Sequence, residues 1–311
     1  MTAPSAPGGM QVLRTPDERF TDLPDWDYEP HYRTVTSDDG IELRYHFVDE
    51  GPRDAAPVLL LHGNPSWSYV HRHMIRGLAG LGHRVVALDL MGLGRSDKPT
   101  DREYYTLARH IDWMEQWLVG EDLRDITLYC QDWGGTTGLN LLPRQGDRFA
   151  RVVASNTGLP AGEGVNTFMQ WWLDYSQSVD MLPISDLTNP IMTHEMTPDE
   201  ARAWNAPFPD GTYQASAFQF PLLIPLQADN PGVPITKATW AYLEQWDKPF
   251  LTVFGALDPV ATRPGAHKAF QQRVPGAQGR PHVMIDDANH FIQEDAPDDL
   301  VRIIDEFIRK G

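Results

Sequence analysis

Short, continuous apolar runs alternate along most of the chain with segments long enough to form helices. The apolar runs lie at 58–61, 85–88, 126–130, 152–154, 250–254 and 283–285. Between and after them, apolar residues recur at helical spacing over 107–118, 135–142, 266–274 and 300–308. Because parallel strands that are covered on both faces read as unbroken apolar runs, this pattern predicts a doubly wound α/β sheet.

Two alternating segments precede this region and have the pattern of antiparallel strands. They cover 31–37 and 41–48, and Asp38-Asp39-Gly40 separates them, a composition typical of a hairpin turn. The sequence therefore predicts a hairpin at one edge of the sheet.

One stretch, 157–236, interrupts the alternation. It contains no strand-like run but many Trp, Phe and Pro residues, with helix-like segments at 168–178 and 197–204. We therefore expect an α/β core formed by 1–156 and 237–311, into which 157–236 is inserted as a helical cap. No disordered linker flanks the insertion, so the cap should pack on the core.

The composition narrows the classes of partner and compartment. The formal net charge of −17 at pH 7 repels a phosphate backbone or an anionic membrane, so neither nucleic acid nor a membrane is expected as a partner. No apolar run approaches the roughly 18 residues of a membrane helix. The single cysteine, Cys130, excludes an intramolecular disulfide and a Cys-based zinc site. The amino terminus does not resemble a signal peptide, and we expect a cytoplasmic protein.

A candidate nucleophile lies where the run 126–130 passes into a helix. Residues 128–135 read Leu-Tyr-Cys-Gln-Asp-Trp-Gly-Gly, so the small residues Cys130 and Gly134 lie two positions before and after Asp132. This is the pattern of a nucleophile elbow, a strained turn that exposes its central residue. A carboxylate is already ionised at neutral pH and can attack a saturated carbon that bears a leaving group. The alternative is that Asp132 only caps the following helix.

The loop after the run 58–61 supplies a second feature of such a site. Residues 62–65 read His-Gly-Asn-Pro, and from this position a backbone N–H can reach an oxyanion. We expect the backbone N–H groups of Asn64 and Trp133 to form the oxyanion hole. His62 is interpreted as a structural histidine that bonds the loop.

A base and a carboxylate that orients it follow the last two predicted strands. These residues are His290 and Asp258, and because parallel strands open onto one crevice at their carboxyl ends, both can face Asp132. By contrast, the residues after 152–154 are Ser-Asn-Thr, which offer no carboxylate. In this arrangement the carboxylate holds the imidazole tautomer and stabilises its cation.

Together these motifs resemble those of the haloalkane dehalogenases of the α/β-hydrolase superfamily. The resemblance covers nearly the whole chain and rests on residues 62–67, 89–99, 131–135, 255–259 and 290–294. It implies an α/β-hydrolase fold and the hydrolysis of a haloalkane to an alcohol and a halide. The implied route is an alkyl ester on Asp132 that water activated by His290 then hydrolyses. The expected partners are therefore a small halogenated alkane, water and a halide ion.

One subgroup of this family has its acid after the penultimate core strand, where Asp258 lies, and binds the halide with two tryptophans. Indole N–H groups suit a halide because they donate a hydrogen bond without adding charge. The resemblance implies Trp133 and one residue of the cap, either Trp171 or Trp172, and the spacing to the next aromatic residue favours Trp172. The alternative is that the tryptophans only fill the core of the cap. Asn64 departs from the subgroup, whose best-known members are acidic there, so its side chain is a further candidate donor.

Two other functions remain open, and no cofactor or metal is expected. An epoxide hydrolase shares the aspartate nucleophile, the base and the cap, and would need tyrosine donors such as Tyr175 and Tyr213. A catalytically silent relative would act as a binding protein. The run 92–96 lacks the third glycine of a dinucleotide motif, and His71 and His73 would face different ways on a helix.

Overall fold

The central feature of the computed structural model, which describes residues 9–262 and 264–310, is an eight-stranded sheet. Its strand order is β10-β9-β8-β7-β4-β5-β3-β2, and neighbouring strands are parallel except where β3 pairs with β2 and β5. The strands are β2 (His31–Thr36), β3 (Glu42–Glu50), β4 (Pro57–Leu61), β5 (Arg84–Leu88), β7 (Ile126–Gln131), β8 (Phe149–Ser155), β9 (Phe250–Gly255) and β10 (Val283–Ile285). The predicted α/β sheet with an edge hairpin is confirmed.

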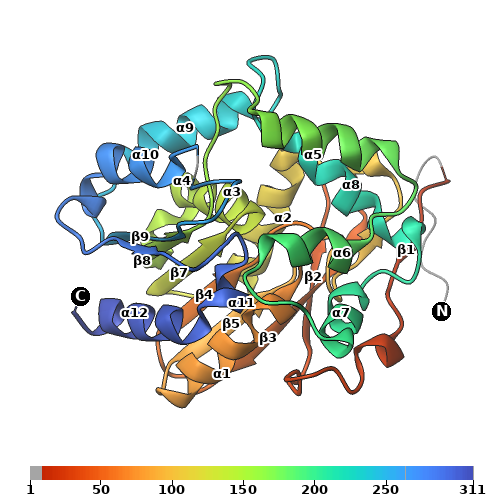
Figure 1. Cartoon of the computed structure of the whole chain (residues 1–311), viewed down its shortest axis with the longest axis horizontal. Coiled ribbons are helices and arrows are strands. Elements are labelled where there is room, and N and C mark those ends of the chain that lie inside the picture. The colour runs from red at the N-terminus through yellow and green to blue at the C-terminus, as the bar shows by residue number, and fades with distance from the viewer. Residues whose placement is uncertain (1–8, 263, 311) are drawn as a thin grey trace.

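Helices cover both faces of this sheet (Figure 1). One face carries α1 (Arg72–Gly80) and α12 (Pro297–Lys310), which pack against each other. The opposite face carries α2 (Leu107–Gly120), α3 (Trp133–Leu139), α4 (Leu142–Gln145), α9 (Val233–Leu243) and α10 (Ala266–Arg273). Among the helices of the described residues, none is both long and apolar enough to cross a membrane.

Between β8 and α9 the chain forms further helices that lie beside the sheet and are drawn in green to teal in Figure 1. They are α5 (Thr167–Ser178), α6 (Ile184–Thr188), α7 (Pro198–Asn205) and α8 (Ala215–Leu223). The sequence does not predict helix α8, because its apolar residues are not confined to one face and because Pro221, a residue that usually ends a helix, lies inside it. The expected boundary between residues 236 and 237 lies inside α9, which packs on α4 of the core.

Shorter elements connect these layers. A two-stranded antiparallel sheet joins β1 (Val12–Leu13) to β6 (Lys98–Pro99), and Thr15 just beyond it donates a 2.7 Å hydrogen bond to the carbonyl of Pro207. The amino-terminal segment thereby ties the region after α7 to the core. The remaining short elements are α11 (Ile292–Asp295) and 3₁₀ turns at Asp17–Phe20, Ser68–His71, Arg102–Tyr104, Gly146–Arg148, Asn189–Ile191, Gly211–Gln214 and Pro275–Ala277.

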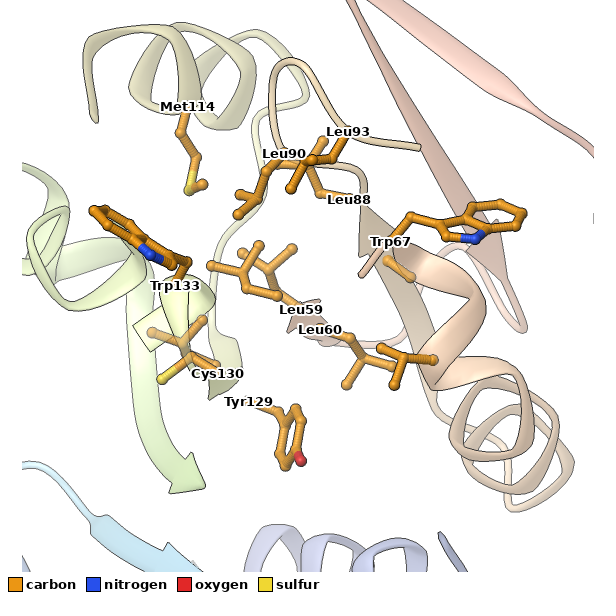
Figure 2. Close-up of a cluster of buried hydrophobic side chains, with 14 of the residues drawn as sticks. Leu59, Leu60, Trp67, Leu88, Leu90, Leu93, Met114, Tyr129, Cys130 and Trp133 are labelled. Carbon is orange, nitrogen blue, oxygen red and sulfur yellow. The ribbon is translucent and has the colours of Figure 1, made fainter. Parts of the chain in front are cut away.

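The hydrophobic core surrounds the two central strands β4 and β7. Figure 2 shows Met114 of α2, Leu90 and Trp133 gathered around Leu59 of β4, all of them buried. Every residue of β4 and β7 is buried, as expected for strands covered on both faces. The carboxyl end of β7 is therefore held rigidly at the centre of the sheet, and the elbow lies at this point.

Candidate active site

Asp132 occupies the turn between β7 and α3 with a backbone conformation that is rare for a residue other than glycine. Its φ and ψ are 51° and −122°, and its side chain makes no capping bond to α3, unlike the simple N-cap considered above. The helix can approach the sheet closely because residue 134 is glycine: a Cβ there would lie 2.2 Å from the carbonyl oxygen of Leu61. The close packing of α3 on β4 therefore enforces the strained turn that carries the carboxylate.

The loop after β4 supplies donors to this carboxylate. The backbone N–H of Asn64 donates to Asp132 Oδ1 at 2.9 Å, and the backbone N–H of Trp133 also stabilises the charged form. Both expected oxyanion-hole donors therefore interact with the carboxylate of Asp132. The Asn64 side chain is held separately, because its amide donates to the carbonyl of Ala217 in α8 at 3.3 Å.

His290 lies between two carboxylates. Its Nδ1 is 3.1 Å from Oδ1 of Asp258, and its Nε2 is 3.7 Å from Oδ2 of Asp132. Asp258 is fully buried on the loop after β9 and accepts backbone hydrogen bonds from Val260 at 2.8 Å and Ala261 at 3.1 Å. The structure therefore brings together the three residues that the sequence singled out from distant segments.

The pKa values of this group reflect burial working against charge. Burial raises the pKa of Asp132, and the charge of His290 and the two backbone donors offset this only in part. Burial also acts to raise the pKa of Asp258, but His290 and the backbone N–H donors outweigh it, so that pKa is lowered. Burial lowers the pKa of His290, yet Asp258 and Asp132 raise it above its ordinary value. Asp258 is therefore the stably ionised partner that supports an imidazolium.

Asn156 is a residue of the site that sequence reasoning missed. Its amide donates to the carbonyl oxygens of Asn289 at 2.6 Å and His290 at 3.0 Å, and its Oδ1 accepts from the backbone N–H of Gly255 at 2.8 Å. One side chain at the end of β8 thereby fixes the loops that carry Asp258 and His290. The signal in the sequence is its position directly after a predicted strand, but an amide, unlike a carboxylate, is not a candidate for the acid.

A cavity of about 900 Å³ lies over Asp132, between the core and the helices that follow β8. Trp133 lines it and packs against Phe220 of α8 with ring centroids 4.6 Å apart. Trp171 and Trp172 both border the cavity; Trp171 is half exposed, whereas Trp172 packs against the hydrophobic core. The lining is mainly apolar, which suits an apolar substrate.

The tyrosines that an epoxide hydrolase would require do not reach this cavity. Neither Tyr175 nor Tyr213 is among its described lining residues, and Tyr175 instead stacks on Trp171 with centroids 5.6 Å apart. Within the part of the chain that the structure describes, no tyrosine O–H therefore lines the cavity to protonate an alkoxide.

His62 has the structural role that was expected of it. It is fully buried, and its Nε2 accepts the backbone N–H of Leu90 at 2.9 Å while its Nδ1 lies 2.8 Å from the carbonyl of Gly63. The glycine-rich turn at 92–96 is likewise structural, because it wraps around the buried carboxylate of Asp89, which accepts the backbone N–H of Arg95 at 2.8 Å.

One cluster of the described residues has side chains of metal-ligand type. It consists of His194, Glu200 and Glu294, whose ligand atoms lie within 4.8 Å of one another. Arg72 forms ion pairs with both glutamates, so a guanidinium already supplies the positive charge there. His71 and His73, the pair considered from the sequence, are not members of this cluster.

Known proteins match the chain along almost its full length. A family model described as the alpha/beta hydrolase fold matches residues 56–297. The haloalkane dehalogenase of Psychrobacter cryohalolentis is 45% identical over 300 residues, which cover 96% of this chain and 98% of that protein. Haloalkane dehalogenase 1 of Mycobacterium tuberculosis is 46% identical over 292 residues, covering 94% of this chain and 96% of that protein.

The likeness extends to three dimensions. A solved structure described as the tetrameric haloalkane dehalogenase DpaA from Paraglaciecola agarilytica matches with a TM-score of 0.86 at 32% identity, covering 97% of this chain and 99% of that chain. Neither the sequence relatives nor this structure leaves a sizeable part of the chain unmatched. The chain therefore belongs to the haloalkane dehalogenases, enzymes of the α/β-hydrolase superfamily.

Proposed function

We propose that this enzyme hydrolyses a halogenated alkane to an alcohol and a halide through a covalent ester on Asp132. The observation that carries the proposal is the position of the Asp132 carboxylate, which projects from a strained elbow under an apolar cavity and lies 3.7 Å from His290 Nε2. An ionised carboxylate in an apolar site needs no base for its first attack. Asp132 is therefore the nucleophile, and Asp258 and His290 are the acid and base that act later.

In the first step, Oδ2 of Asp132 attacks the carbon that bears the halogen. The new carbon–oxygen bond forms as the carbon–halogen bond breaks, and the electron pair leaves with the halide. Oδ1 is held by the backbone N–H of Asn64, which leaves Oδ2 as the oxygen that faces the cavity and His290. The product is a neutral alkyl ester.

In the second step, Nε2 of His290 takes a proton from water while the water oxygen attacks Cγ of Asp132. Negative charge then develops on Oδ1, where the N–H groups of Asn64 and Trp133 stabilise it. The tetrahedral intermediate collapses, the alcohol leaves with the proton held by the imidazolium, and Asp132 is left as a carboxylic acid. Loss of its remaining proton to solvent restores the carboxylate, so that each turnover releases one proton together with the alcohol and the halide. Asp258 stabilises the imidazolium throughout.

The halide is held by indole N–H groups of Trp133 and Trp172, with residues 157–236 acting as the cap that excludes water. Both tryptophans border the cavity, and Trp172 is partly buried where Trp171 is half exposed. One N–H of the Asn64 side-chain amide donates to the carbonyl oxygen of Ala217, and the other N–H is a further candidate donor to the halide. The position of Asp258 after β9 supports membership of the subgroup with its acid after the penultimate core strand.

The proposal is tested by supplying 1,2-dibromoethane and styrene oxide in separate incubations. We expect bromide and 2-bromoethanol from the first and no enzymatic diol from the second, because no described tyrosine lines the cavity. Rapid diol formation without bromide release would instead identify an epoxide hydrolase. Absence of turnover with either compound, and with longer bromoalkanes, would favour a silent binding protein.

A further inference from the structure

Gln131, the last residue of β7, contacts the proposed base directly. It is fully buried, and its amide nitrogen lies 3.2 Å from Nε2 of His290 and 3.2 Å from the backbone oxygen of the same residue. Nε2 is the nitrogen that must take a proton from water in the proposed reaction. Gln131 therefore contacts the base at the nitrogen that reacts.

The orientation of the Gln131 amide is set at both of its ends. The backbone oxygen of His290 can only accept a hydrogen bond, so the NH₂ group must face it. At the other end, Oε1 of Gln131 accepts from the amide nitrogen of Gln293 at 3.3 Å. If the Gln131 amide were flipped, its oxygen would face the backbone oxygen of His290, and its NH₂ group would face the NH₂ group of Gln293.

This orientation determines which nitrogen of His290 carries the proton at rest. A ring nitrogen that faces an N–H donor has to present its lone pair, so Nε2 is unprotonated. The proton of the neutral ring is then on Nδ1, which lies 3.1 Å from Asp258. Gln131 and Asp258 thus select the same tautomer from opposite sides of the ring.

Gln293 is itself held from behind by a second buried histidine. Its amide nitrogen lies 3.5 Å from Nε2 of His71, which is fully buried at the start of α1. Burial keeps the pKa of His71 well below its ordinary value, so this ring is neutral and can accept a hydrogen bond. The donors therefore run in a consistent direction from Gln293 to both His71 and Gln131, and from Gln131 to His290.

We propose that Gln131, oriented by Gln293, is a positioning residue that favours the neutral form of His290 with Nε2 free to act as a base. The contact exists only while Nε2 is unprotonated, because an imidazolium would oppose one donor with another. The charged groups around the ring, Asp132, Asp258 and Asp295, all favour the imidazolium. Gln131 is the neutral group that opposes them. The catalytic consequence rests on the proposed function, whereas the effect on the ring itself does not.

The test is an NMR titration of ¹⁵N-histidine-labelled enzyme without substrate, using His290→Gln to assign the signal. Gln131→Met removes the donor but keeps the length of the side chain. In this variant we expect the titration midpoint of His290 to move to higher pH by about half a pH unit or more. Gln293→Met should move it in the same direction by less, since Gln131 then loses only its orienting partner. An unchanged midpoint in Gln131→Met overturns the proposal.

Ser155→Ala is the matched control. Ser155 is the register partner of Gln131 on the neighbouring strand, is equally buried, and bonds the carbonyl of Val253 rather than His290. We expect it to leave the midpoint in place, and a shift equal to that of Gln131→Met would show that any lost buried bond has this effect. If Gln131→Met does not fold, Gln293→Met decides the question alone, and no shift there overturns the proposal.

A kinetic measurement separates this inference from the proposed function. In Gln131→Met the acid side of the pH–rate profile for ester hydrolysis should move to higher pH, together with the NMR titration midpoint of His290. The rate of the first bromide release should stay within about threefold of wild type. If no ester forms on Asp132 in the wild-type enzyme, the proposed function fails but the titration still tests the contact. If the ester forms and the midpoint does not move, only the role of Gln131 fails.

Discussion

At the scale of single residues, Asp258 uses both of its carboxylate oxygens in hydrogen bonds. Oδ1 faces His290 and the backbone N–H of Val260, and Oδ2 accepts from the backbone N–H groups of Ala261 and Thr262. In Asp258→Asn an NH₂ group must face one of these donors, and the negative charge is lost. We expect ester hydrolysis to slow by about 10²- to 10⁴-fold, and alkylation to slow much less.

Rapid-quench measurement of bromide and alcohol from one turnover distinguishes the two steps. Bromide should appear at close to the wild-type rate while alcohol lags and the ester accumulates. If bromide and alcohol both formed more slowly to the same extent, the result would point to general damage to the site. If alcohol formed at the normal rate, a residue other than Asp258 would be the acid.

The pKa of His290 should depend on the step of the reaction. Burial lowers this pKa, but the charges of Asp258 and Asp132 raise it above its ordinary value in the free enzyme. The ester carries no charge, so its formation removes the contribution of Asp132 and lowers the pKa. Because only neutral His290 can accept a proton from water, ester hydrolysis should continue at lower pH than the titration of the free enzyme would suggest.

Single-turnover hydrolysis rates across pH, set against the NMR titration of His290 in the free enzyme, check this order. The kinetic midpoint should lie below the NMR midpoint. A kinetic midpoint equal to or above it would contradict the proposed neutral ester on Asp132.

The proposed halide ligands can be tested by removing only their N–H donors. Trp133→Phe and Trp172→Phe retain an aromatic ring, so packing is largely kept, and each lost donor should raise the alkylation barrier by about 2–4 kcal/mol. Bromide binding, followed by quenching of tryptophan fluorescence, should weaken in both variants. Trp171→Phe is the control, because adjacent helix residues point about 100° apart. Loss of bromide binding in Trp171→Phe but not in Trp172→Phe would reverse the choice between them.

At the scale of secondary structure, the strands of the sheet could be predicted and several helices could not. β4 and β7 are buried on both faces, so their sequences are mostly apolar over a length that is typical of a strand and too short for most helices. Helix α1 contains Gly77 and Gly80, which weaken its helical pattern, and α8 has no polar face. These helices are specified by their contacts with other elements, which local sequence does not record.

The same reasoning applies to the side chains of the site. Asp132, Asp258 and His290 could be predicted because each follows a strand and all strand ends share one edge. Gln131 and Asn156 could not, because glutamine and asparagine are common at such positions and their importance lies in which atoms they face. The choice between Trp171 and Trp172 depends on the rotation of α5, which the sequence does not fix.

A buried ion-pair cluster joins three elements near the site and makes a stability prediction. Arg72 of α1 pairs with Glu294 of α11 and Glu200 of α7, and the Arg72 and Glu294 side chains are almost fully buried. Arg72→Met leaves the Glu294 carboxylate buried without a cation, which should lower the free energy of unfolding by about 3–5 kcal/mol. Urea unfolding measures this loss.

The double variant Arg72→Met/Glu294→Met serves as the control. It removes both charges, so we expect it to recover much of the stability that Arg72→Met loses. If Arg72→Met unfolds at the same urea concentration as wild type, the cluster does not hold these elements together.

At the scale of the whole molecule, the sheet and the helices after β8, which we propose to form a cap, contribute different parts of the site. The turn that carries Asp132, the proposed oxyanion donors, Asp258 and His290 all come from loops at the carboxyl ends of the central strands, so their geometry depends on a rigid core. The apolar cavity of about 900 Å³ is instead completed by α5 and the other helices after β8. We therefore expect substitutions in the cap to change which haloalkanes are used, and substitutions at the strand ends to change the chemistry.

The covalent ester on Asp132 is the claim on which the whole proposed mechanism depends, and His290→Gln tests it most directly. This variant should still form the ester but be unable to activate water, so 1,2-dibromoethane should give about one bromide per enzyme molecule and then stop. Mass spectrometry of the digested protein should find the bromoethyl group on the peptide that contains Asp132, and Asp132→Ala should give neither bromide nor adduct. Steady multiple turnover by His290→Gln, or a burst of bromide with Asp132 unmodified, would contradict the covalent mechanism.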